Sequence, residues 1–267
     1  MLSLKSLPFG LVLAWLAVLS AGHAHGVVLT WDSVAWPAGS LTNSFDVDPA
    51  SPGNDITVSF ADPSTILTQD VKFGPTTPAI TNTLQGGLSP AHNSLLLSIQ
   101  VTDSSQFITL TINFSPQYTQ GVQNVSFSLF DIDMLTGKGA YQDQIRSISG
   151  LSTDGSTLIA PTITGVGSSV TLAGIGTAQT LTGNAVAADT GAGSNAGNAT
   201  INFGSTALQS VTLIYGCGPG SPTVPGGQHI SLDDISFSAV PEINFGWPCA
   251  ILCSAAGVAA VCRQQRQ

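Results

Sequence analysis

The chain has 267 residues, of which 43% are hydrophobic and 8% charged, and it carries a formal net charge of −9. A surface of that sign repels phosphate backbones, so the composition excludes a nucleic-acid-binding protein. Residues 26–239 contain 14 aspartates, no glutamate and three basic residues, Lys72, Lys138 and Arg146. Glutamate and lysine are common on helix surfaces and aspartate in turns, so few helices are expected there.

Residues 1–24 have the three regions of a secretory signal peptide. Lys5 precedes an apolar run over residues 7–19, and small residues follow at 20–24. We expect cleavage after Ala24. The alternative is a retained membrane helix, although the apolar run is shorter than the about 17–25 residues of a span. A bacterial lipoprotein is excluded, because the first cysteine is Cys217 and no cysteine lies near the cleavage site.

Ten short runs with the composition of strands follow, separated by Gly, Pro, Asn and Asp. Ile108, Leu110 and Ile112 alternate with threonines, which predicts a strand with one buried face. The runs are 27–31, 43–47, 55–60, 95–101, 107–114, 125–133, 144–149, 199–203, 208–215 and 230–238. They predict an all-β domain over 26–239, a two-sheet antiparallel jelly-roll-like sandwich. The small-residue-rich segment 165–200 has two or three weak edge strands or a long loop.

Two strands change their alternation at acidic residues. In the run 125–133, Asp131 and Asp133 continue the apolar parity of Leu129, so either the carboxylates face the core or a bulge at Leu129–Phe130 reverses the register. In the run 230–238, the apolar parity switches at Asp233–Asp234. Bulges gather at edges and functional sites, so both positions are of interest.

The first of these positions is a candidate calcium site. Asp131 and Asp133 lie on one side of a strand, and Asp143 follows the turn at 136–139 and could return beside them. Calcium takes six to eight oxygen ligands, which carboxylates, carbonyls and water supply. We expect Ca²⁺ at Asp131, Asp133 and Asp143. The alternative is a solvated turn whose charge is offset by Lys138 and Arg146.

No catalytic motif is present: the sequence lacks a Gly-x-Ser-x-Gly elbow, a phosphate-binding loop and a His-Glu-x-x-His pair. After signal removal the histidines are His25, His92 and His229, which are widely separated. We therefore expect a noncatalytic protein. Four aromatic residues are candidates for stacking on sugars, with core or turn positions as the alternative for Trp31 and Tyr141: Trp31, Trp36, Tyr118 and Tyr141.

The end of the chain, 240–267, combines Pro241–Glu242, an apolar segment at 246–262 and the basic residues Arg263 and Arg266. An apolar run that begins near Ile243 is long enough for a transmembrane helix, and the arginines would stay on the cytoplasmic side. A buried core helix is the alternative. Cys249, Cys253 and Cys262 are either small apolar helix residues or sites of lipidation.

This arrangement resembles the PEP-CTERM sorting signal of Gram-negative bacteria that make exopolysaccharide. The resemblance implies that an exosortase recognises Pro241 and Glu242 and passes the protein to the cell surface or extracellular matrix. The runs 127–145 and 232–237 are also similar to ectodomains that precede such tails, which implies fold more than activity. We expect a noncatalytic surface or matrix protein associated with exopolysaccharide or the envelope. The alternatives are a carbohydrate-binding module or adhesin and, third, a glycan-acting enzyme.

Overall fold

A computed structural model describes residues 25–241, except 50, 69, 71, 73 and 187–193. The predicted signal peptide at 1–24 and transmembrane helix at 246–262 lie outside these residues, as do Glu242, Arg263 and Arg266 of the sorting motif. Residues His25–Val240 form one compact unit. The described part of the chain contains no helix long and apolar enough to cross a bilayer.

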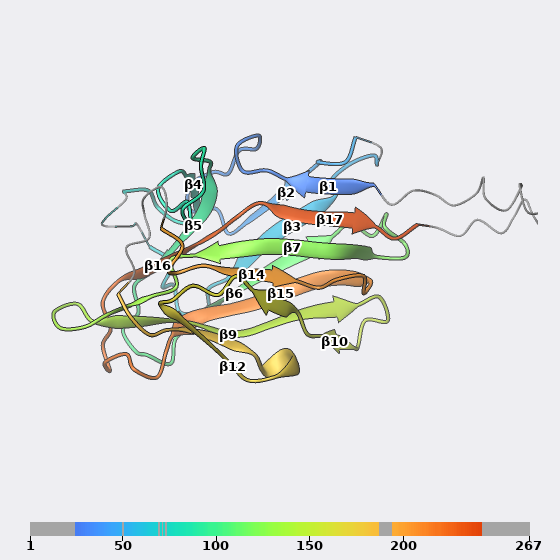
Figure 1. Cartoon of the computed structure of the whole chain (residues 1–267). Coiled ribbons are helices and arrows are strands. Elements are labelled where there is room, and N and C mark those ends of the chain that lie inside the picture. Colours follow the sequence, from blue (N-terminus) through green and yellow to red (C-terminus); the bar gives the residue numbers. More distant parts are fainter. Residues whose placement is uncertain are drawn as a thin grey trace, which may run out of the picture. The chain divides into compact units, whose positions relative to one another are not determined.

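The described residues form antiparallel strands, and their one helical turn is the 3-10 helix η1 (Gly176–Ala178). The expectation of an all-β antiparallel domain is therefore confirmed (Figure 1). All ten predicted segments contain strands, and Phe107–Phe114 has the predicted bounds. The segment 165–200 holds a hairpin of two short strands, Val170–Ala173 and Thr180–Gly183. Of the two alternatives predicted for this segment, short strands and a long loop, the structure shows short strands.

The strands form two ladders. In the first ladder, the central strand β7 (Val122–Phe130) pairs with β14, β16 and β17. Each of these three strands has a further partner: β11 pairs with β14, β5 pairs with β16, and β1 pairs with β17. Strand β4 pairs with β5. The bounds of its other strands are β1 Gly26–Leu29, β4 Ala79–Thr81, β5 Ser94–Ile99, β11 Thr162–Thr164, β14 Ala199–Asn202, β16 Gln228–Leu232 and β17 Ile235–Ala239.

The second ladder runs in the order β2, β3, β6, β15, β9, β13 and β12, and the short strands β8 and β10 also pair with β9. The bounds are β2 Thr42–Phe45, β3 Ile56–Ala61, β6 Phe107–Phe114, β8 Met134–Leu135, β9 Tyr141–Ser152, β10 Leu158–Ile159, β12 Val170–Ala173, β13 Thr180–Gly183 and β15 Leu208–Cys217. One pair, Leu208 with Val122, joins the ladders into a single curled sheet.

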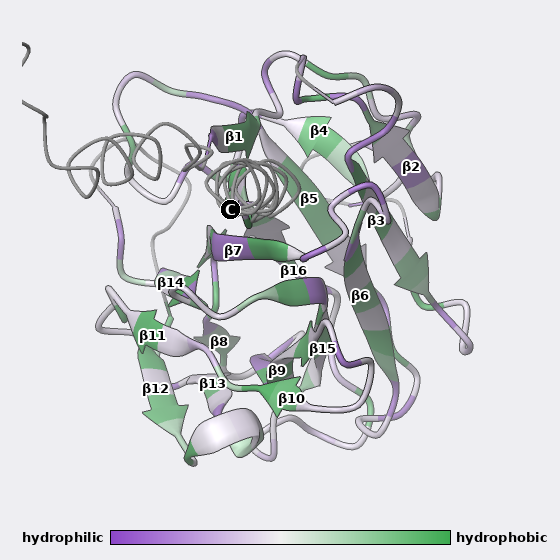
Figure 2. Cartoon of the chain, turned by 90° about the vertical axis from the view of Figure 1, so that its right-hand side faces the viewer, coloured by the Kyte–Doolittle hydropathy of each residue, from purple (hydrophilic) through white to green (hydrophobic). Residues whose placement is uncertain are grey.

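The core lies between the two ladders. Along β3 and β6 the buried and less buried residues alternate, as the period of a half-buried strand requires. Figure 2 shows the strands coloured by hydropathy. Phe114 on β6 packs against Phe237 on β17 with ring centroids 5.0 Å apart, so the apolar faces of the two ladders are in contact. β5 differs because all six of its residues are buried, including Ser94 and Ser98.

A cluster of four aromatic residues belongs to this core: Trp31, Trp36, Phe45 and Phe60, with neighbouring ring centroids 5.9–6.3 Å apart. Trp31 is 0% exposed and Trp36 8%. Neither ring is available to stack on a sugar, so these two candidates are wrong as sugar-binding residues. For Trp31 the core position given as the alternative is confirmed.

Candidate functional site

The end of β7 shows how the first acidic pair is accommodated. The strand stops at Phe130, and Asp131 has a φ of 69°, in the left-handed region that aspartate tolerates better than most residues. Leu129 and Ile132 both belong to the hydrophobic core, whereas β7 keeps regular pairing through Leu129 and Phe130. The apolar parity therefore changes at Asp131, beyond the predicted bulge at Leu129–Phe130. The carboxylates are nevertheless inside the protein, because Asp131 and Asp133 are only 3% and 4% exposed.

A histidine accompanies the first of these carboxylates. His229, on β16, has its Nε2 3.0 Å from Asp131 Oδ2 and its Nδ1 3.2 Å from Asp70 Oδ2. Both carboxylates are almost fully buried. A buried charge is tolerated only when it is paired, and the two ring nitrogens of His229 lie at ion-pair distance from the two acids.

Asp143, on β9, is fully buried beside Asp133. The hydroxyl of Tyr215 donates to Asp143 Oδ1 at 2.6 Å, and the backbone N–H of Asp133 donates to Asp143 Oδ2 at 3.2 Å. Burial, and then the neighbouring Asp133 carboxylate, raise the pKa of Asp143 well above its usual range. We call Asp70, Asp131, Asp133, Asp143, Tyr215 and His229 the buried cluster.

Two glycines let other segments close over the buried cluster. A Cβ on Gly183, in β13, would lie 1.9 Å from the carbonyl oxygen of Asp133. A Cβ on Gly197 would lie 3.0 Å from the Cα of Asp131. The first distance is impossible for real atoms, so a side chain at residue 183 would push β13 away. The polar residues are thus sealed by backbone that approaches at contact distance.

The three predicted calcium ligands, Asp131, Asp133 and Asp143, all belong to the buried cluster. The structure brings them to one region, but within the described ranges one ligand atom from each does not gather within 4.8 Å of the others. Asp131 lies against His229, and Asp143 accepts a hydrogen bond from Tyr215. Calcium at these residues stays a prediction. Arg146, offered as the offsetting charge, instead donates to the backbone oxygens of Ser104, Ser105 and Cys217.

The second acidic pair forms a bulge between β16 and β17. Three residues, 233–235, lie between Leu232 and Ser236, whereas only two residues of β7 lie between their partners Leu129 and Ser126. The extra residue reverses the parity, so Leu232 and Ile235 both face the core. The switch in alternation seen in the sequence is confirmed.

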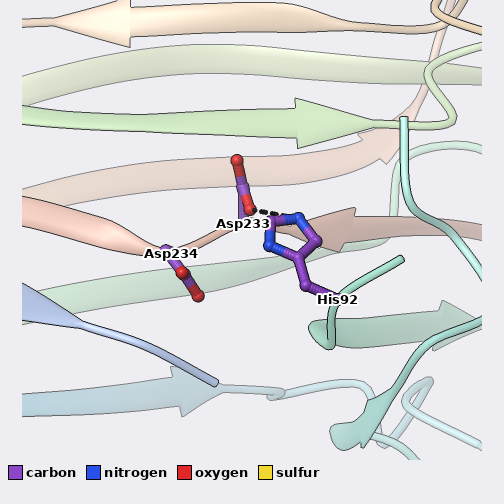
Figure 3. A group of neighbouring side chains, drawn as sticks. All are labelled: His92, Asp233 and Asp234. Atoms are coloured by element: carbon purple, nitrogen blue, oxygen red, sulfur yellow. Dashed lines mark ion pairs between the residues drawn. The ribbon is translucent and has the colours of Figure 1, made fainter. Parts of the chain in front are cut away.

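His92 meets this bulge, as Figure 3 shows. Its Nε2 lies 3.2 Å from Asp233 Oδ1, and one ligand atom from each of His92, Asp233 and Asp234 lies within 4.8 Å of the others. All three residues are half-buried. Burial raises the pKa of Asp233 to about 6 and also raises that of Asp234. We call these three residues the open cluster. Sequence reasoning missed it, because His92 is 141 positions from Asp233 and belongs to no motif.

A pocket of about 330 Å³ lies elsewhere, where β6 and β9 end and β15 begins. Its lining is uncharged and mixes rings with amide and hydroxyl side chains: Asn113, Phe114, Ser115, Pro116, Tyr118, Thr119, Gly121, Leu151, Thr153, Leu208, Gln209 and Ser210. Asn113 and Gln209 are exposed at its surface. The Tyr118 hydroxyl donates to Asp55 Oδ1 at 2.9 Å and its ring packs edge-on against Phe237, so this aromatic side is held in place.

Of the four aromatic candidates, Tyr118 is the one that lines this pocket. Tyr141 is half-buried, and its pKa is raised by burial and by the carboxylates of Asp143 and Asp133. It therefore lies beside the buried cluster, as its position in the sequence indicated. Cys217 is a buried thiol 3.5 Å from Gln228 Oε1, and burial raises its pKa, so it is a packed residue.

A scan against protein-family models finds no match, and neither does a search of curated proteins. Solved structures that resemble the chain include a CBM28 carbohydrate-binding module specific for non-crystalline cellulose (12% identity, 60% of this chain, 78% of that one, TM-score 0.34). Others are the K3 adhesin domain of Lys-gingipain from Porphyromonas gingivalis (10%, 67% and 90%, TM-score 0.32) and the Caldicellulosiruptor saccharolyticus module CBM27-1 (10%, 68% and 90%, TM-score 0.31). With TM-scores this low, the role of the chain has to be inferred from its own residues.

Proposed function

We propose that residues 25–240 form a noncatalytic glycan-binding domain, which takes an uncharged polysaccharide in the pocket between β6, β9 and β15. The observation that carries this proposal is the lining of the pocket. Its amide and hydroxyl groups can exchange hydrogen bonds with sugar hydroxyls, and its accessible apolar residues, Pro116, Tyr118 and Leu151, can contact the apolar faces of a sugar ring.

The absence of charge from the lining bears on the class of ligand. The domain carries a net charge of −11, yet no acidic or basic side chain is among the residues that line the pocket. An acidic polysaccharide would meet a repulsive field with no local basic group to offset it. A neutral glycan is not repelled by that field, so a neutral polysaccharide is the favoured ligand.

Binding of neutral and acidic polysaccharides to the purified full chain tests this, by calorimetry or by retardation in glycan-containing gels. Replacement of Asn113 and Gln209 together by alanine should weaken binding about tenfold, since each lost hydrogen bond contributes about 0.5–1.5 kcal/mol. Asn54→Ala with Gln120→Ala is the matched control, because both residues are exposed and lie outside the pocket lining. Equal loss in both pairs, or binding confined to acidic glycans, would contradict the proposal.

The predicted route to the cell surface completes the proposal. A signal peptide at 1–24 would export the chain, and the sorting tail at 240–267 would hold it in the membrane until an exosortase-like enzyme acts at Pro241–Glu242. The domain would then hold polysaccharide at the surface or in the matrix. Mass spectrometry of the mature protein tests both ends, since removal of 1–24, cleavage of the tail and lipid on a cysteine each give a distinct mass.

A further inference from the structure

The open cluster has the donor set of a metal site, and strand pairing places its members. His92 lies two residues before β5, and Asp233 directly follows β16. β5 and β16 pair with Leu95 opposite Leu232, so the residues just before one strand and just after the other come to the same end of the pair. Figure 3 shows the His92 ring directed at Asp233, with Asp234 beside it.

The distances suit one small ion. A tetrahedral zinc ion bound to imidazole nitrogen and carboxylate oxygen at about 2.0–2.2 Å holds its ligand atoms about 3.4 Å from one another. His92 Nε2 and Asp233 Oδ1 are already 3.2 Å apart, and the third ligand atom lies within 4.8 Å of both.

The surroundings hold the ligands in place. The backbone N–H of Trp31 donates to Asp234 Oδ1 at 2.9 Å, and the Trp31 indole N–H donates to the carbonyl oxygen of Asp233 at 2.9 Å. The backbone N–H of Asn93, next to His92, donates to Asp32 Oδ1 at 3.0 Å. Hydrogen bonds of this kind orient metal ligands and are part of a built site. Trp31 is fully buried, so its contacts are fixed by the core.

The balance of charge also favours a cation. Asp233 and Asp234 place two adjacent carboxylates in a half-buried position beside the imidazole of His92. A divalent ion balances the charge of two carboxylates. Imidazole distinguishes among ions: it suits zinc and its neighbours in the first transition row, whereas calcium and magnesium take oxygen ligands.

We propose that His92, Asp233 and Asp234 bind a divalent transition-metal ion of the zinc class, which fastens the loop before β5 to the bulge between β16 and β17. None of the three lines the pocket between β6, β9 and β15. The metal site and glycan binding can therefore fail independently of one another.

Zinc chloride is titrated into the chelator-treated full chain in a calorimeter. We expect one zinc ion per chain and a higher melting temperature with zinc than with EDTA. Loss of a residue that supports a metal ligand weakens metal binding about 10–100-fold. His92→Ala removes a ligand itself, so it should weaken zinc binding by more than that. His25→Ala is the matched control, because His25 is an exposed histidine outside the cluster, 65% exposed in its side chain.

Three results would overturn the proposal: no zinc binding by the wild type at micromolar concentration, equal affinity in His92→Ala, or displacement of zinc by equimolar calcium. If His92→Ala does not fold, cobalt(II) absorption of the wild type decides the matter. A site with imidazole and few ligands gives strong visible bands, whereas weakly absorbing hydrated cobalt would contradict it.

Discussion

The buried cluster and the open cluster use the same side chains, aspartate and histidine, in two different ways. Around His229 the acids are sealed inside the protein, with Asp131 and Asp70 3.0 and 3.2 Å from the two ring nitrogens. Around His92 the acids are half-buried and have one imidazole between them. The difference lies in the cover: glycine-bearing segments close over the first cluster, while the second sits at a bulge that remains accessible.

This comparison indicates what each cluster does. Carboxylates that are fully enclosed and paired specify how segments pack, because any loss of a partner leaves a buried charge. Half-buried carboxylates beside a histidine remain open to an ion from solvent. The same chemistry is therefore structural in one place and suited to binding in the other.

The largest expected effect comes from breaking the pair between Asp131 and His229. Asp131→Ala should lower the free energy of unfolding by about 3–5 kcal/mol, because it removes one of the two carboxylates that flank the buried His229 ring. Urea denaturation in EDTA measures it. Asp46→Ala, at an exposed aspartate, should change stability by no more than about 0.5 kcal/mol. A loss in Asp131→Ala as small as that in Asp46→Ala would show that the pair does not hold the fold.

A second effect is a pH dependence from Asp143. Its pKa is raised in the folded protein by burial and by Asp133, so the folded state holds the proton more tightly than the unfolded chain does. This contribution is fully present below about pH 4, the ordinary range of an aspartate, and is lost as the pH rises through the raised pKa. Stability measured from pH 4 to 8 should therefore fall less steeply in Asp143→Asn than in the wild type.

The difference between the two pH profiles is the informative quantity, because other aspartates titrate in both proteins. Asp103 and Asp154 are exposed and have a lowered pKa, through hydrogen bonds from Ser105 and Thr157 respectively. Their contributions have the opposite sign and cancel in the comparison. Parallel profiles would mean that Asp143 is ionised inside the protein throughout this range.

The smallest expected effect is that of calcium. If Asp131, Asp133 and Asp143 bind Ca²⁺, excess calcium raises the melting temperature of the wild type relative to EDTA, and Asp131→Ala abolishes the increase. Each variant is compared with itself in EDTA, so its own loss of stability cancels. Identical wild-type melts would remove calcium from the buried cluster. An increase that survives in Asp131→Ala but disappears in Asp233→Asn would place the ion in the open cluster.

Much of the fold could be predicted because strands leave a local signal. The alternation of Ile108, Leu110 and Ile112 with threonines was sufficient to locate β6 to the residue. The short strands β4, β8, β10 and β11 were missed, since two or three residues are too few for a period to appear. The changes in alternation at Asp131 and Asp233 could also be predicted, because they interrupt the same period of two residues that identifies a strand.

The side chains that contact those acids could not be predicted from the sequence. His229 and His92 reach Asp131 and Asp233 only through the pairing of β16 with β5 and β7, which joins residues far apart in the sequence. The burial of Trp31 and Trp36 likewise depends on which side of the sheet the first loop covers. Composition described these tryptophans as candidates for sugar contact, and packing placed them in the core.

The sequence by itself determined that residues 26–239 form strands and where two of them change their alternation, because backbone geometry alternates side chains from one residue to the next. Only the tertiary structure decided which acid is sealed with a histidine, which remains accessible, and where an uncharged pocket opens. Those outcomes depend on contacts between segments that are distant in the chain. Such contacts leave no repeating pattern within either segment, so the sequence of one segment does not predict them.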